Sequence, residues 1–92
     1  MPIEKQQLIN QVQIFLEELK KKNPEKESLE WYLINNLNKY LTSLIIANTS
    51  QEIKIANEKL GMFCIDCMDW DTPLFKRCTE ITNLGLKISR YN

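Results

Sequence analysis

All three cysteines of this chain lie within one short stretch, FCIDCMDWDTPLFKRC, at residues 63–78. Cys64 and Cys67 form a C-x-x-C pair, and Cys78 follows eleven residues after Cys67. Thiolates spaced in this way can bind zinc or iron, or exchange disulfides. A closed zinc site needs four ligands. Because the chain has no histidine, the fourth ligand would come from another chain or from one of three aspartates, Asp66, Asp69 and Asp71.

The position of the C-x-x-C pair argues against this chemistry. A redox pair is expected at the start of a helix, where the helix dipole favours the thiolate. Here the pair stands at the C-terminal end of a helical pattern, beside carboxylates that disfavour a thiolate. Cys64, Cys67 and Cys78 also fall on the apolar faces of the helices expected around them. We therefore predict small buried core residues, and keep a metal- or redox-active protein that uses all three as the alternative.

No other catalytic constellation is recognisable in the sequence. The aspartates of residues 66–71 lack the glycine and the closing glutamate of a calcium loop, and helix capping explains Asp69 and Asp71. Without histidine, a histidine-based triad is impossible, and no phosphate-binding or dinucleotide-binding glycine pattern is present. The sequence therefore predicts a protein that is not an enzyme and needs no cofactor.

Composition narrows the class of protein further. Twelve basic and twelve acidic side chains cancel, whereas a nucleic-acid binder normally has a basic excess, so no nucleic-acid partner is expected. No window approaches the 18 or so apolar residues of a membrane span, and the first residues do not resemble a signal peptide. An odd number of cysteines suits a reducing compartment. A cytoplasmic protein without a membrane span is the expectation.

The elements that must position these residues are all helical. Apolar side chains recur at steps of three and four residues, with only two glycines and three prolines in 92 residues. We predict one all-α domain, a small antiparallel up-down four-helix bundle, with helices over residues 4–22, 28–47, 50–68 and 73–91. Ser28 is the expected cap of the second helix, Thr49 with Glu52 has the spacing of a capping box, and Pro73 suits a first turn.

The core faces follow from the same spacing. Leu37 and Leu60 are central to the second and third helices, and Ile45 is expected to widen the face of the second. Gly85, within the fourth helix, marks a close crossing by another helix because a glycine inside a helix otherwise costs about 1 kcal/mol. Trp70, at the junction of the last two helices, is expected to cover an end of the bundle.

Several apolar residues miss these core faces and form second stripes. Ile55 and Met62 are aligned on the third helix, Phe75 and Leu86 on the fourth, and Trp31 lies off the main face of the second. The two aligned pairs would merge into one patch if the helices turned them to the same side. A second stripe must meet something outside the core or lie in water. These five residues are the predicted partner-binding site.

The expected function is therefore a non-catalytic interaction module: an adaptor, a chaperone-like subunit, or an inhibitor or immunity protein. It would bind another protein or itself through the second apolar surface. In size and number of helices the chain is similar to small bacteriocin immunity proteins. That resemblance implies the architecture alone and carries no functional residues across.

Overall fold

The computed structural model describes the backbone of residues 2–90 and the side chains of residues 5–89. Four helices follow one another, α1 (Pro2–Lys21), α2 (Leu29–Ile46), α3 (Ser50–Cys67) and α4 (Pro73–Arg90). The predicted all-α class is confirmed, and all four helices match their expected ranges within two residues; residue 91, the expected end of the last helix, lies outside the described residues.

The helix starts are set by the capping side chains that the sequence indicates. Ser28 accepts a hydrogen bond from the Trp31 backbone N–H, and Thr49 accepts one from the Glu52 N–H. Thr72 does the same for Phe75, with an oxygen–nitrogen distance of 3.3 Å, and Pro73 is the first residue of α4. Each cap satisfies a backbone donor that the helix cannot satisfy itself, so it fixes where the helix begins.

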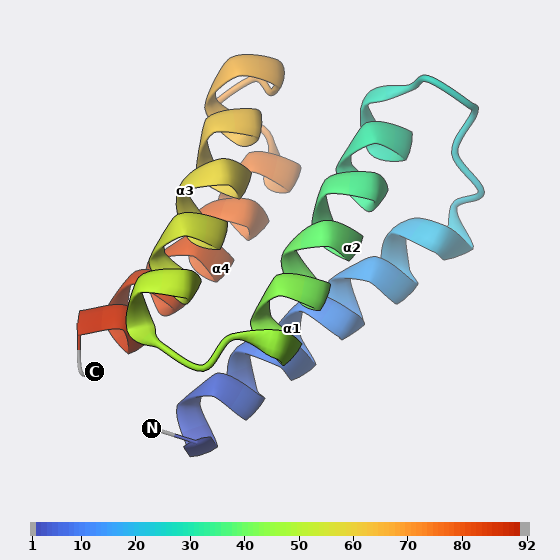
Figure 1. The fold of residues 1–92 in the computed structure, drawn as a ribbon. Coiled ribbons are helices and arrows are strands. Elements are labelled where there is room, and N and C mark those ends of the chain that lie inside the picture. Colours follow the sequence, from blue (N-terminus) through green and yellow to red (C-terminus); the bar gives the residue numbers. More distant parts are fainter. Residues whose placement is uncertain (1, 91–92) are drawn as a thin grey trace.

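The helices pack in a ring in which each contacts its neighbours in the order α1, α2, α3, α4 and back to α1 (Figure 1). Successive helices run in opposite directions, so the start of α1 and the end of α4 lie at the same end of the bundle. The α3–α4 interface is the most extensive and the α1–α4 interface the least. The bundle measures 38 × 22 × 17 Å.

One hydrophobic core runs along the bundle axis. Leu37 and Leu60 lie at its centre and are almost completely buried, as the spacing predicts. Ile45 does not belong to it and is 58% exposed. It follows the buried Leu44 directly, and successive helix residues point about 100° apart, so only one of the two can face the core. The prediction that Ile45 widens the core face is wrong.

Candidate functional site

The turn between α3 and α4 is held at both ends by hydrogen bonds. Met68 ends α3: its N–H donates to the Cys64 carbonyl oxygen, and its side chain is buried. At the other end, the Thr72 hydroxyl donates to the Asp69 carbonyl oxygen at 2.7 Å, and the Thr72 N–H donates to the same oxygen at 3.3 Å. The residues between them, Asp69 to Asp71, are therefore presented to solvent on a defined turn.

Trp70 occupies the tip of this turn, and two contacts fix its ring. The indole stacks on Phe75, with ring centroids 6.0 Å apart and planes inclined by 21°. Its Nε1–H donates to the Ile65 carbonyl oxygen at 3.2 Å. The side chain nevertheless remains 65% exposed. Trp70 thus covers Phe75 and not the bundle core, contrary to the expectation that it closes the end of the bundle.

Ile65, Trp70 and Phe75 together are called the Trp70 platform below. Ile65 is exposed, and Phe75 is half-buried between Trp70 and the core. An open groove of about 780 Å³ runs beside the platform, and its lining residues come from the turn and the outer side of α4: Trp70, Asp71, Thr72, Pro73, Phe75, Lys76, Thr79 and Glu80. Trp70 and Phe75 of the platform therefore form one wall of a recess.

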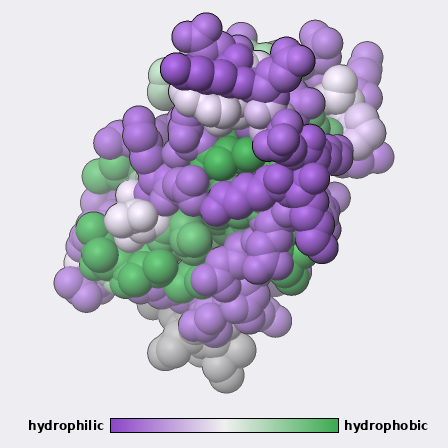
Figure 2. All heavy atoms as spheres, turned by 90° about the vertical axis from the view of Figure 1, so that its right-hand side faces the viewer, coloured by the Kyte–Doolittle hydropathy of each residue, from purple (hydrophilic) through white to green (hydrophobic). Residues whose placement is uncertain are grey.

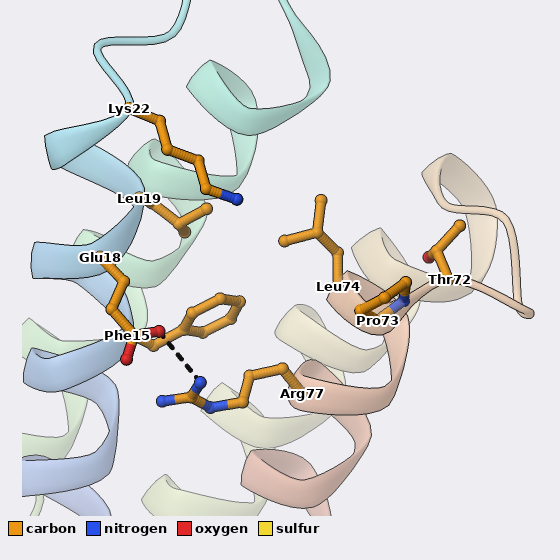
Figure 3. A pocket seen from close by; sticks show the side chains of 8 residues that line it. All are labelled: Phe15, Glu18, Leu19, Lys22, Thr72, Pro73, Leu74 and Arg77. Atoms are coloured by element: carbon orange, nitrogen blue, oxygen red, sulfur yellow. Dashed lines mark hydrogen bonds and ion pairs between the residues drawn. The ribbon is translucent and has the colours of Figure 1, made fainter.

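A second hollow of about 390 Å³ lies on the other side of the first turn of α4, between α4 and the end of α1 (Figure 3). Leu19 and Leu74 point toward one another across it, and the Lys22 amine reaches over it. Arg77 closes one side: its guanidinium bonds Glu18 at 3.0 Å and lies over the Phe15 ring, 5.0 Å from the centroid.

Thr72 and Pro73 line both hollows. The first turn of α4 is therefore a ridge with an apolar recess on each side. A partner that contacted this end of the bundle would meet the ridge, the Trp70 platform and the pocket beside Leu74 at once. We call this surface the α3–α4 corner.

The five sequence-predicted site residues lie in different places. Ile55 and Met62 are exposed on α3, Met62 by 64%, and Leu86 is exposed on α4. Met62 precedes Cys64, which faces α4, by two residues and so points about 160° away from it. Met62 thus faces away from α4 and does not form one patch with Phe75. The ring of Phe75 stacks on Trp70 instead. The binding role of these residues stays a prediction.

Trp31 lies apart from these residues, near the start of α2. It is half-buried, with its ring edge-to-face against Tyr32 at a centroid distance of 5.0 Å. Ile45 lies on a similar side of α2 but about 21 Å further along the helix, so the two side chains do not form one surface. Figure 2 shows the face formed by α1 and α2, with hydrophobic atoms gathered in its lower left part and hydrophilic atoms over most of its upper part.

The cysteines divide into a buried pair and an exposed residue. Cys64 and Cys78 are buried in the core, and their thiols interact: Cys78 lowers the pKa of Cys64, and Cys64 raises the pKa of Cys78. Cys67 is exposed, so the prediction that it is buried is wrong. It is the last residue of α3, and the side chain of Met68, the residue that follows the helix, is buried in the core instead. Among the side chains of residues 5–89, no group of three or more potential metal ligands gathers.

Trp70 and Asn57 are the residues that sequence reasoning missed. The proline and the aspartates around Trp70 do indicate an exposed turn, but its contacts with Ile65 and Phe75 depend on how the chain reverses there. Asn57 is a buried polar residue inside an apolar face, and only its helical position next to Ala56 hints at burial.

Comparisons with protein-family models, curated proteins and solved structures find no match to this chain. None of the helices within residues 2–90 is long and apolar enough to cross a membrane.

Proposed function

We propose that this protein is a non-catalytic interaction module that binds another protein through the α3–α4 corner. The observation that carries the proposal is the side chain of Trp70, which is 65% exposed yet held by a ring stack and a hydrogen bond. A fixed aromatic ring loses little conformational freedom when a partner covers it. Tryptophan is also among the residues most often found to dominate binding energy in protein interfaces.

Charge around the platform indicates the chemistry of the partner. Asp69 and Asp71 flank Trp70 in the turn and are exposed, and Glu80 lines the groove beside Lys76. Three acidic side chains thus stand near the platform against one basic side chain, whereas the pocket beside Leu74 is lined by Lys22, Arg77 and Glu18. The fitting partner segment presents an apolar side chain for the groove, with basic side chains beside it. Complementary charge of this kind speeds association and makes its rate fall with added salt.

The test is capture of binding proteins from an extract of the cells that make this protein. Immobilised wild-type protein is compared with Trp70→Ala and with Ile46→Ala, which removes an equally exposed apolar side chain on α2. We expect a protein that wild type and Ile46→Ala retain and that Trp70→Ala loses, with weaker retention at high salt. Circular dichroism should show the same helix content for all three.

Two outcomes would overturn this proposal. One is a bound protein that Trp70→Ala retains as well as wild type does. The other is self-association that Trp70→Ala removes, measured by sedimentation over a range of concentrations, because the occupant of the corner would then be a second copy of the chain. In a Trp31→Phe background Trp70 is the sole tryptophan, so a blue shift of its emission reports directly on which species covers it.

A further inference from the structure

The register of α3 against α4 places Cys64 and Cys78 opposite each other, two turns from a close approach of the two helices. Asn57 on α3 faces Gly85 on α4: a Cβ atom at residue 85 would be 2.5 Å from the Asn57 Oδ1 atom. Cys64 is seven residues after Asn57, and Cys78 is seven residues before Gly85. The helices are antiparallel, and seven residues make about two turns. Cys64 should therefore face Cys78 in the same way as Asn57 faces Gly85.

The surroundings of the two sulfur atoms favour contact between them. Both side chains are buried, and the two thiols interact across the helix interface, because each shifts the pKa of the other. The α3–α4 interface is the most extensive in the bundle, and the missing side chain at Gly85 lets the two backbones approach. A disulfide needs Cβ atoms about 3.5–4.5 Å apart, and a close approach of the two helices favours such a separation.

We propose that Cys64 and Cys78 form an oxidative modification site, in which a peroxide converts the buried thiol pair into an intramolecular disulfide between α3 and α4. In the first step the Cys64 sulfur attacks one peroxide oxygen, the O–O bond breaks, and a sulfenic acid and water form. In the second step the Cys78 sulfur attacks the sulfenic sulfur, the S–S bond forms, the S–O bond breaks, and the released hydroxide takes the Cys78 proton. Two thiols lose two electrons, and one peroxide becomes two waters.

The roles of the two residues follow from their hydrogen bond. Donation from the Cys78 thiol lowers the pKa of Cys64, because it stabilises the Cys64 thiolate. The same donation, together with burial, raises the pKa of Cys78. The first attack is assigned to Cys64 because the thiolate is the reactive form, and the disulfide product is the same whichever sulfur attacks first. Cys67 is exposed and lies one turn after Cys64, so it is the competing thiol that the test must separate.

Tryptic peptide mapping under non-reducing conditions distinguishes these pairings. Cleavage after Lys59, Lys76, Arg77 and Lys87 places Cys64 and Cys67 in one peptide, residues 60–76, and Cys78 in another, residues 78–87. In Cys67→Ser, a peroxide-treated sample should yield these two peptides joined by a disulfide, and dithiothreitol should separate them. Because residue 67 is exposed, this substitution leaves the core intact.

The control is the double variant Cys67→Ser with Cys78→Ala, treated with peroxide in the same way. It keeps every methionine and tryptophan, so their oxidation affects both proteins equally. We expect oxidation to raise the melting temperature of Cys67→Ser, because the new bond closes a loop and restricts the unfolded chain. The melting temperature of the control should not rise. The bond would span the whole turn that carries Trp70.

Two results would overturn the proposal. The first is a folded, peroxide-treated Cys67→Ser in which both cysteines remain free or end as separate sulfenic or sulfinic acids. The second is a disulfide that joins two molecules. Neither result depends on a binding partner, so the failure of this site and the failure of the proposed function are distinguishable.

Discussion

At the scale of single residues, one buried hydrogen-bond chain connects three helices. The Tyr40 hydroxyl on α2 donates to the Asn57 Oδ1 atom on α3 at 2.9 Å, and the Asn57 Nδ2 group donates to the Thr82 carbonyl oxygen on α4 at 2.9 Å. Buried polar groups are costly unless they are paired, and this chain pairs them. Because the bonds require one relative position of three helices, they select one packing among those the apolar side chains allow.

Gly85→Ala tests how tightly this chain is packed. The new methyl group would lie 2.5 Å from the Asn57 Oδ1 atom and 2.7 Å from the Tyr40 hydroxyl oxygen, so it must displace hydrogen-bonded atoms. We expect a net loss of about 1–2 kcal/mol of unfolding free energy in urea titration, despite alanine's better helix propensity. Gly61→Ala is the matched control, since nothing lies within 4 Å of its new Cβ, and it should gain about 0.5–1 kcal/mol. Equal effects at both glycines would contradict the close crossing.

Tyr40 should make stability depend on pH at the alkaline end. Burial raises the pKa of Tyr40 well above its usual value near 10. The folded state therefore keeps this proton where the unfolded state releases it, so stability is complete below about pH 10 and falls as pH rises further. One proton contributes a slope of about 1.4 kcal/mol per pH unit. Comparing urea midpoints of wild type and Tyr40→Phe from pH 9 to 11 should show the smaller loss in Tyr40→Phe.

At the scale of the helices, the start of α3 is held by a capping box. The Thr49 hydroxyl accepts from the Glu52 N–H at 3.2 Å, while the Glu52 carboxylate accepts from the Asn48 N–H and the Thr49 hydroxyl. Thr49→Ala should lower the unfolding free energy by about 1 kcal/mol, measured by chemical denaturation. Thr42→Ala, an exposed threonine inside α2, is the control and should be neutral or slightly stabilising, because alanine is the better helix former. A loss at residue 42 as large as that at residue 49 would remove the capping explanation.

The helices could be read from the sequence because their determinants are local. Periodic apolar residues give the faces, and the caps at Ser28 and Thr49 give the starts. Cys67 shows where this reasoning stops. Its spacing matches the core face of α3, but spacing does not reveal that Met68, the residue after the helix, takes the core position instead. Trp70 could not be placed for a related reason, since its neighbours depend on the path of a turn.

At the scale of the whole molecule, the four interfaces are unequal. α3 packs extensively on α4, whereas α1 has the least extensive interface with α4 and leaves the pocket beside Leu74 open. Polar contacts that join α1 to the rest of the bundle include the Glu18–Arg77 ion pair and the bond from the Lys5 amine to the Ala47 carbonyl oxygen, just after α2, at 2.7 Å. Exposed ion pairs contribute less than about 1 kcal/mol, so α1 is held mainly by its apolar face.

This inequality predicts that α1 opens before the rest of the bundle. In native-state amide hydrogen exchange, residues 8–19 of α1 should exchange at least about tenfold faster than residues 53–64 of α3, because local opening follows the extent of packing. Arg77→Ala removes both the ion pair with Glu18 and the contact with the Phe15 ring, so it should accelerate exchange in α1 while leaving α3 nearly unchanged. Lys76→Ala, an exposed neighbour on the same helix, should change neither. Equal protection in α1 and α3 would instead show that the bundle opens as one cooperative unit. The pocket between α1 and α4 would then be a fixed recess and not a place where α1 separates from α4.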